Sequence, residues 1–136
     1  MSLSNVRNKA IFSWVYQIHQ ADGSITGQEH RFLMELAKHL RLTEVEVLAI
    51  IDHPEDYPMH PPPSEYERMR ILYYLLFAME VDGEISKKEE SKLYQFGLKL
   101  GFQPEMLKDM IDVLAFYLGK TLPDEALLGL IKKYAN

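Results

Sequence analysis

The chain has 136 residues, of which 47% are hydrophobic and 26% are charged, an ordinary composition for one globular domain. Its formal net charge of −5 disfavours nucleic acid and anionic membranes as partners, because both are bound through basic surfaces. The absence of cysteine excludes disulfides, thiolate metal sites and cysteine nucleophiles.

Apolar residues at helical spacing predict three helices in the first part of the chain, at residues 5–21, 26–41 and 43–52. Gly23 is expected to end the first of them, because glycine accepts the left-handed conformation that follows a helix. The first residues lack the basic segment and apolar run of a signal peptide. Together with the absence of cysteine, this favours a cytoplasmic location.

Residues 53–63 contain five prolines, which forbid an α-helix there and make this segment the only plausible linker. Two readings concern its chemistry. His53 and His60 bracket two acidic residues and could bind a transition metal, but a solvated loop is the preferred interpretation. The three consecutive prolines at 61–63 could be recognised by a partner, but a rigid spacer is favoured.

Four further helices are predicted at residues 64–81, 86–100, 104–118 and 123–135, and no segment has the alternation of a strand. The longest apolar run, from Ile71 to Met79, is nine residues long. A membrane-spanning helix needs about 20 such residues. The run therefore predicts a buried core helix, and no direct insertion into a membrane is expected.

A repeat with an offset of 60 residues relates the two parts of the chain. Asp-Gly-x-Ile occurs at residues 22–25 and again at 82–85, and each copy precedes a Ser/Thr-x-x-Glu capping box. The register continues outside the loops through these apolar pairs: Ile11 and Ile71, Trp14 and Tyr74, Leu33 and Leu93, Leu36 and Phe96, Leu40 and Leu100. Such self-similarity indicates a duplicated structural unit.

We therefore predict one all-α domain, residues 1–136, with about seven helices. Repeat one (4–52) and repeat two (64–118) should be related by a pseudo-twofold axis, with 4–52 superposing on 64–112. Trp14 and Tyr74 should occupy equivalent positions where the halves meet. Four more side chains are expected to be buried: Leu36, Leu75, Phe96 and Leu100. Tyr73, Tyr74 and Phe77 are interpreted as core, whereas residues 84 and 87–90 are interpreted as a solvated helix start.

The acidic loops have a structural and a metal-binding interpretation. As structure, each glutamate completes a capping box and each aspartate accepts hydrogen bonds within a turn. The same spacing matches the second half of a calcium-binding EF-hand loop. Ile18 and Ala78 fall where the first acidic ligand belongs, so a normal EF-hand is not expected. His19 and His30 flank the first loop and could join a metal site, but they are interpreted as surface or boundary residues.

The two copies, Ala21-Asp22-Gly23 with Ile25 and Glu29, and Val81-Asp82-Gly83 with Ile85 and Glu89, resemble the TerB-like family of bacterial tellurite-resistance proteins. The resemblance covers residues 6–118 and implies a cytosolic helical bundle linked to tellurite or stress response, with no established catalytic activity. It also implies that loop carboxylates chelate metal, which maps here onto Asp22, Glu29, Asp82 and Glu89. Residues 53–63 do not match the family pattern.

The leading hypothesis is a non-catalytic TerB-like interaction or stress-response module that binds another protein. The alternative is a protein that binds calcium, magnesium or manganese through Asp22, Glu29, Asp82 and Glu89. An enzyme ranks third, because the sequence has no zinc-protease His-Glu-x-x-His motif, no nucleophile elbow and no phosphate-cradling glycine loop. No catalytic residue and no organic cofactor are predicted.

Overall fold

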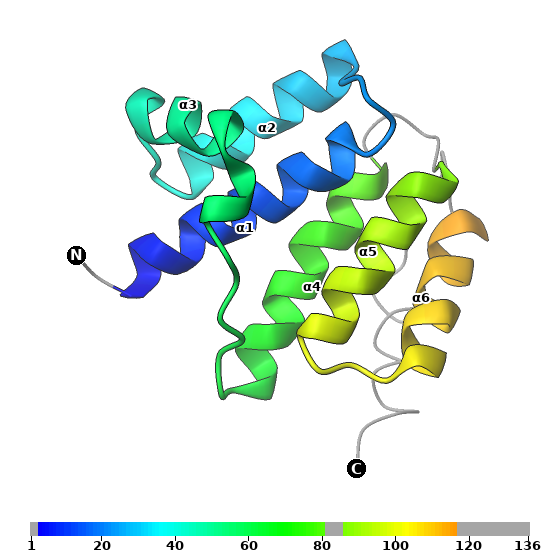
Figure 1. Cartoon of the computed structure of the whole chain (residues 1–136). Coiled ribbons are helices and arrows are strands. Elements are labelled where there is room, and N and C mark those ends of the chain that lie inside the picture. The colour runs from blue at the N-terminus through cyan, green and yellow to red at the C-terminus, as the bar shows by residue number, and fades with distance from the viewer. Residues whose placement is uncertain (1–2, 81–85, 117–136) are drawn as a thin grey trace.

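The computed structural model describes residues 3–80 and 86–116, and all its regular structure within them is helical. The elements of these ranges are α1 (Leu3–Gln20), α2 (Gly27–His39), α3 (Glu44–Asp52), the 3₁₀ helix η1 (Pro54–Asp56), α4 (Glu65–Glu80), α5 (Lys87–Lys99) and α6 (Pro104–Phe116) (Figure 1). The prediction of an all-α protein is confirmed. The predicted last helix, 123–135, lies outside the described residues.

The 60-residue repeat is visible in the helix boundaries and in the hydrogen bonds that define them. α2 and α5 have the same length and begin at equivalent residues, as their capping boxes predict. Both helices also end alike. The residue after each C-cap, Arg41 or Gly101, has a positive φ of 58° or 93°. The amides that follow donate to equivalent carbonyls, Leu42 to Ala37 and Phe102 to Gly97.

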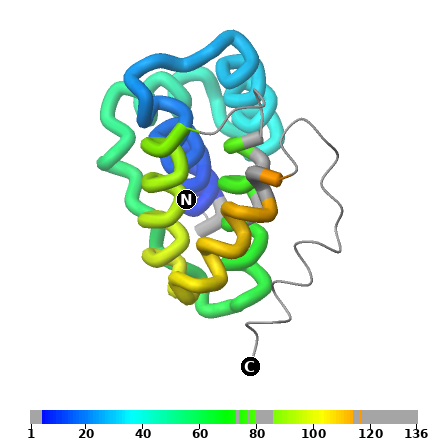
Figure 2. The backbone as a smooth tube through the Cα atoms, turned by 90° about the vertical axis from the view of Figure 1, so that its right-hand side faces the viewer, coloured from blue at the N-terminus to red at the C-terminus, as the bar shows by residue number. Residues whose placement is uncertain are grey.

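Helix α1 lies at the centre of the bundle and contacts α2, α3, η1, α4 and α5. Figures 1 and 2 show α2 and α3 on one side of α1, with α4, α5 and α6 on the other. α5 packs between α4 and α6. The chain therefore forms one bundle in which both repeats share the central α1–α4 contact.

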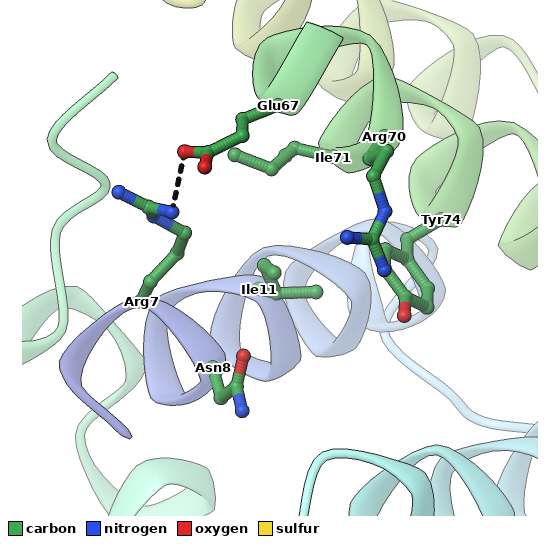
Figure 3. Close-up of a pocket in the computed structure, with 7 residues that line it drawn as sticks. All are labelled: Arg7, Asn8, Ile11, Glu67, Arg70, Ile71 and Tyr74. Atoms are coloured by element: carbon green, nitrogen blue, oxygen red, sulfur yellow. Dashed lines mark hydrogen bonds and ion pairs between the residues drawn. The ribbon is translucent and has the colours of Figure 1, made fainter. Parts of the chain in front are cut away.

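Two pairs of repeat-equivalent residues meet between α1 and α4. The Arg7 guanidinium is 2.7 Å from the Glu67 carboxylate, although the two side chains are 60 residues apart in sequence. Ile11 and Ile71, another equivalent pair, line the same cleft (Figure 3). Equivalent residues of a duplicated unit contact one another where the axis relating the halves passes. Both pairs are what a pseudo-twofold relation predicts for the α1–α4 contact, although α1 contacts α3 and α5 more extensively than α4 contacts the equivalent α6 and α2.

The core lies where the two halves meet. Trp14 from α1 stacks on Phe96 from α5, with ring centroids 4.3 Å apart and an interplanar angle of 3°. The expected burial is confirmed for Leu36, Leu75, Phe96 and Leu100. Tyr74 is only partly buried, because its hydroxyl lies 2.9 Å from His39 Nε2 near the surface. The side chains of Tyr73 and Phe77 lie outside the described part of the chain.

The segment 53–63 is anchored to the bundle at a few residues, while His53, Glu55, Asp56 and His60 are exposed, as expected of a solvated loop. Pro54 begins η1, a position where a missing amide hydrogen is tolerated. The buried Ser13 hydroxyl of α1 donates to the Pro54 carbonyl at 2.6 Å. Met59 and Pro62 are buried. Apolar side chains within the proline-rich segment therefore fix its path across the bundle.

Candidate functional site

The glutamates of the two loops are buried capping residues. Glu29 accepts from the Thr26 amide at 2.9 Å, and Glu89 accepts from the Ser86 amide at 3.1 Å. Only 3% of Glu29 and 5% of Glu89 is exposed. The capping interpretation is confirmed, whereas the solvated helix start expected around Glu89 is wrong for this residue. Glu89 precedes the buried Leu93 by four positions, so it lies on the inward face of α5.

His19 is also buried, with 1% of its surface exposed, so its interpretation as a surface or boundary residue is wrong. It lies on the face of α1 that meets α4, and its Nε2 is 2.7 Å from the Ala78 carbonyl oxygen. Because a carbonyl only accepts, this nitrogen carries the proton. Glu29 Oε2 is 4.0 Å from the same nitrogen. Among the residues that the structure describes, the Nδ1 atom has no hydrogen-bond partner.

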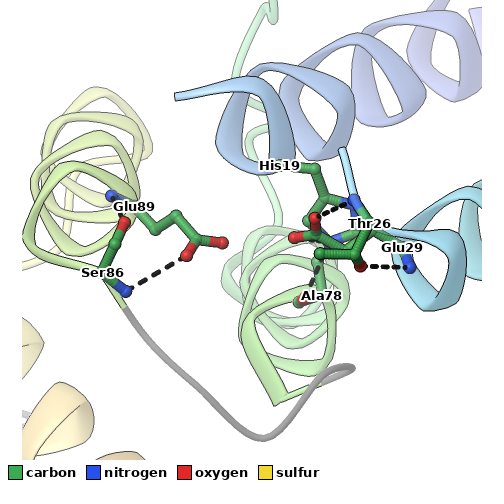
Figure 4. Close-up of polar contacts among 6 residues, drawn as sticks. All are labelled: His19, Thr26, Glu29, Ala78, Ser86 and Glu89. Carbon is green, nitrogen blue, oxygen red and sulfur yellow. Dashed lines mark hydrogen bonds and ion pairs between the residues drawn. The ribbon is translucent and has the colours of Figure 1, made fainter. Parts of the chain in front are cut away.

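The carboxylates of Glu29 and Glu89 point toward each other from α2 and α5 (Figure 4). Burial raises the pKa of Glu89, and the negative charges of Glu29 and Asp22 raise it further. The hydrogen bonds from Ser86 act in the opposite direction. Burial first, and the nearby negative charges second, therefore oppose ionisation of Glu89.

The four predicted metal ligands are only partly brought together. Glu29 and Glu89 converge, while Asp22 is exposed in its loop. Asp82 lies outside the described residues. Within the described ranges, no group of three or more histidine, aspartate or glutamate side chains is arranged to hold a metal ion. His30, His53 and His60 are exposed and separate from the buried pair. Cation binding by these loops stays a prediction.

A different surface, on α3, was missed by the sequence analysis. Val45 is 78% exposed and Leu48 is 58% exposed, and the adjacent Ala49 is exposed as well. Spacings of three and four residues place them on one side of α3, whereas Val47 and Ile50 are buried on the other. The signal was present in the sequence, because six of the seven residues at positions 45–51 are apolar, more than one buried face requires.

The second repeat shows what an ordinary solvent face looks like at this place. The residues of α6 equivalent to Val45, Leu48 and Ala49 are all charged; they are Glu105, Lys108 and Asp109. The fold therefore accepts charged side chains at these positions. The apolar face of α3 is a property of the first repeat and not a requirement of the bundle.

The surroundings of the α3 face are acidic. Residues 41–56 contain five carboxylates and a single basic side chain, Arg41, apart from His53. Four of these carboxylates are on exposed residues: Glu44, Asp52, Glu55 and Asp56. An exposed apolar surface with a polar rim is typical of an interaction site. Here the rim is negative.

The fifth carboxylate, Glu46, fixes α3 to α1. It accepts from the Thr43 amide at 2.8 Å and lies 3.3 Å from Lys9 Nζ and 3.4 Å from Asn5 Nδ2. The backbone hydrogen bond from Thr43 is the main cause that lowers the pKa of Glu46 to about 2. These contacts hold the first turn of α3 against α1, so its apolar face is presented in a fixed orientation.

Comparison of the chain with models of protein families, with curated protein sequences and with solved structures finds no match. Within residues 3–80 and 86–116, no helix has both the length and the apolar character needed to cross a bilayer.

Proposed function

We propose that the protein is a non-catalytic, TerB-like interaction module whose α3 face binds a cationic amphipathic helix of another protein. The observation that carries the proposal is the exposure of Val45 and Leu48 on a helix whose counterpart in the second repeat is charged. The paired Asp-Gly loops support the TerB-like assignment, and the acidic rim of α3 supports a basic partner.

Charge distinguishes this partner from two others. In a symmetric dimer formed through α3, the acidic rim of one copy would face the same rim of its partner, and like charges would repel. An anionic membrane surface would be repelled in the same way. A partner helix with apolar residues at a spacing of three and four, flanked by lysine or arginine, satisfies both the apolar face and its rim.

The test uses a fluorescent amphipathic peptide of about 18 residues, with leucines on one face and lysines on the other. Anisotropy measures its binding to the full chain and to Val45→Glu/Leu48→Lys. This double variant places the α6 residue types on α3 and leaves the net charge unchanged. We expect the variant to bind at least about tenfold more weakly, because the apolar contact is lost.

Tyr66→Ser is the matched control, since Tyr66 is another exposed apolar side chain, at the start of α4. It should bind the peptide as the wild type does. Asp52→Asn should weaken binding at low salt and have little effect at high salt, because its carboxylate acts through the rim charge. Equal binding by wild type and Val45→Glu/Leu48→Lys would overturn the proposal, as would no binding by the wild type. Sedimentation that shows a Leu48-dependent dimer would assign the face to a second copy instead.

A further inference from the structure

A cleft of about 170 Å³ lies between the N-terminal halves of α1 and α4, and no residue of α3 lines it. Figure 3 shows Arg7 and Arg70 reaching into it from opposite ends, with Ile11 and Ile71 between them. Glu67, Asn8 and Tyr74 complete the lining. The cleft therefore joins two guanidinium groups with an apolar floor.

The charges of the cleft do not balance. The Arg7 guanidinium is paired with Glu67 at 2.7 Å. Arg70 has no hydrogen bond or ion pair with any residue of the described chain, and it is exposed. The lining therefore carries one net positive charge in a chain whose overall charge is −5. A local positive charge of this kind attracts an anion.

The repeat shows that Arg70 is not needed to build the α1–α4 contact. Its equivalent in the first repeat is Ala10, which is buried. The pairs Arg7–Glu67 and Ile11–Ile71 each bring two repeat-equivalent residues together at this contact, and neither pair involves Arg70. Arg70 departs from this symmetry and adds a guanidinium where the fold alone requires none.

We propose that this cleft binds a small aliphatic carboxylate, with Arg70 as its main ligand. A guanidinium matches the two oxygens of a carboxylate in a bidentate pair. Ile11 and Ile71 supply an apolar floor for a short alkyl chain. A dianion such as phosphate fits less well, because the Glu67 carboxylate borders the cleft and repels additional negative charge. This proposal is independent of the proposed function.

The test is a titration of the ¹³C,¹⁵N-labelled full chain with butyrate, acetate and inorganic phosphate, followed by NMR. We expect saturable shifts of the Arg70 side-chain Nε–H signal and of the Ile11 and Ile71 methyl groups. Butyrate should bind more tightly than acetate, because its alkyl chain contacts the isoleucines.

Arg70→Gln should weaken butyrate binding about tenfold or more, since a charge-assisted pair is lost. Arg70→Lys should fall between wild type and Arg70→Gln, because charge is kept without the bidentate geometry. Arg31→Gln removes an exposed arginine of α2 with the same change in net charge and should bind as wild type does. Undiminished butyrate binding in Arg70→Gln, shifts that do not saturate, or tighter binding of phosphate than of butyrate would overturn the proposal.

Discussion

Two glutamates that complete capping boxes in the same way have pKa values shifted in opposite directions. Glu89 is buried beside Glu29, and its pKa is raised, whereas the pKa of Glu46 is lowered to about 2 by its hydrogen bonds. The sequence shows both as the third residue of a capped helix. Their surroundings come from helices distant in the chain, so only the structure separates the two cases.

Glu89→Gln should stabilise the protein at neutral pH. A raised pKa in the folded state means that the proton stabilises the folded form, and this contribution is lost as the pH rises through the folded pKa. Glutamine keeps an oxygen for the Ser86 amide and removes the buried charge. Urea unfolding at pH 7 should give a higher free energy of unfolding for the variant, with the difference disappearing below about pH 4. A less stable variant at pH 7 would contradict the assignment of burial as the main cause.

Glu46→Gln should lower the free energy of unfolding at neutral pH. A lowered pKa means that the ionised carboxylate stabilises the folded form above the unfolded pKa, and this contribution is lost as the pH falls toward about 2. The variant should be less stable than the wild type at pH 7, and the two should converge in acid. Parallel stability curves from pH 7 to pH 2 would show that the Thr43 and Lys9 contacts do not act through charge.

Cation binding by the loop carboxylates is tested through its effect on thermal stability. If calcium, magnesium or manganese binds to the folded loops, it must raise the midpoint of thermal unfolding by mass action. Asp22→Asn/Asp82→Asn should abolish that rise. An equal rise in wild type and variant, or none at several millimolar cation, would leave the loop carboxylates with their structural role alone.

In each repeat, a smaller side chain on the second helix accompanies a larger one on the third. Ala37 and Val47 in repeat one correspond to Gly97 and Leu107 in repeat two. A Cβ atom at Gly97 would lie 2.5 Å from Leu107 Cδ2, a contact too short to tolerate without movement. The smaller residue on α5 therefore makes room for the larger one on α6.

Gly97→Ala should destabilise the protein by about 1–3 kcal/mol through overpacking, partly offset by the better helix propensity of alanine. Leu107→Val in the same chain should restore much of the loss, because it recreates the residue pair of repeat one. Denaturant unfolding of the two single variants and the double variant measures the coupling. Additive losses would show that the two residues do not compete for the same space.

Most of the element structure follows from local signals in the sequence. Thr26 and Ser86 cap helices where their capping boxes predict, and Gly23 has the expected positive φ of 89°. The 3₁₀ helix at Pro54 was not expected, because five nearby prolines argue only against an α-helix. Its path depends on contacts with α1 that no local pattern contains.

For the whole molecule, the sequence predicted the burial of Leu36, Leu75, Phe96 and Leu100, but not the burial of His19 or the exposure of Leu48. The burial of His19 depends on how closely α1 meets the Ala78 end of α4. The exposure of Leu48 depends on no element of the described chain covering the outer side of α3. Both are consequences of packing between segments that are distant in the sequence. The exposure of Leu48 can be compared with its charged counterpart in α6 only when the structure shows which side of each helix is exposed.

If α3 carries the partner surface and its repeat counterpart α6 does not, a peptide should perturb only α3 and the segment that follows it. The measurement is a map of amide shifts in the ¹⁵N-labelled wild-type chain during titration with the leucine–lysine peptide. We expect saturable shifts concentrated in residues 44–56, with little change in α6. Shifts of equal size in α6, or shifts confined to the acidic loops near Glu29 and Glu89, would show that α3 is not the binding surface.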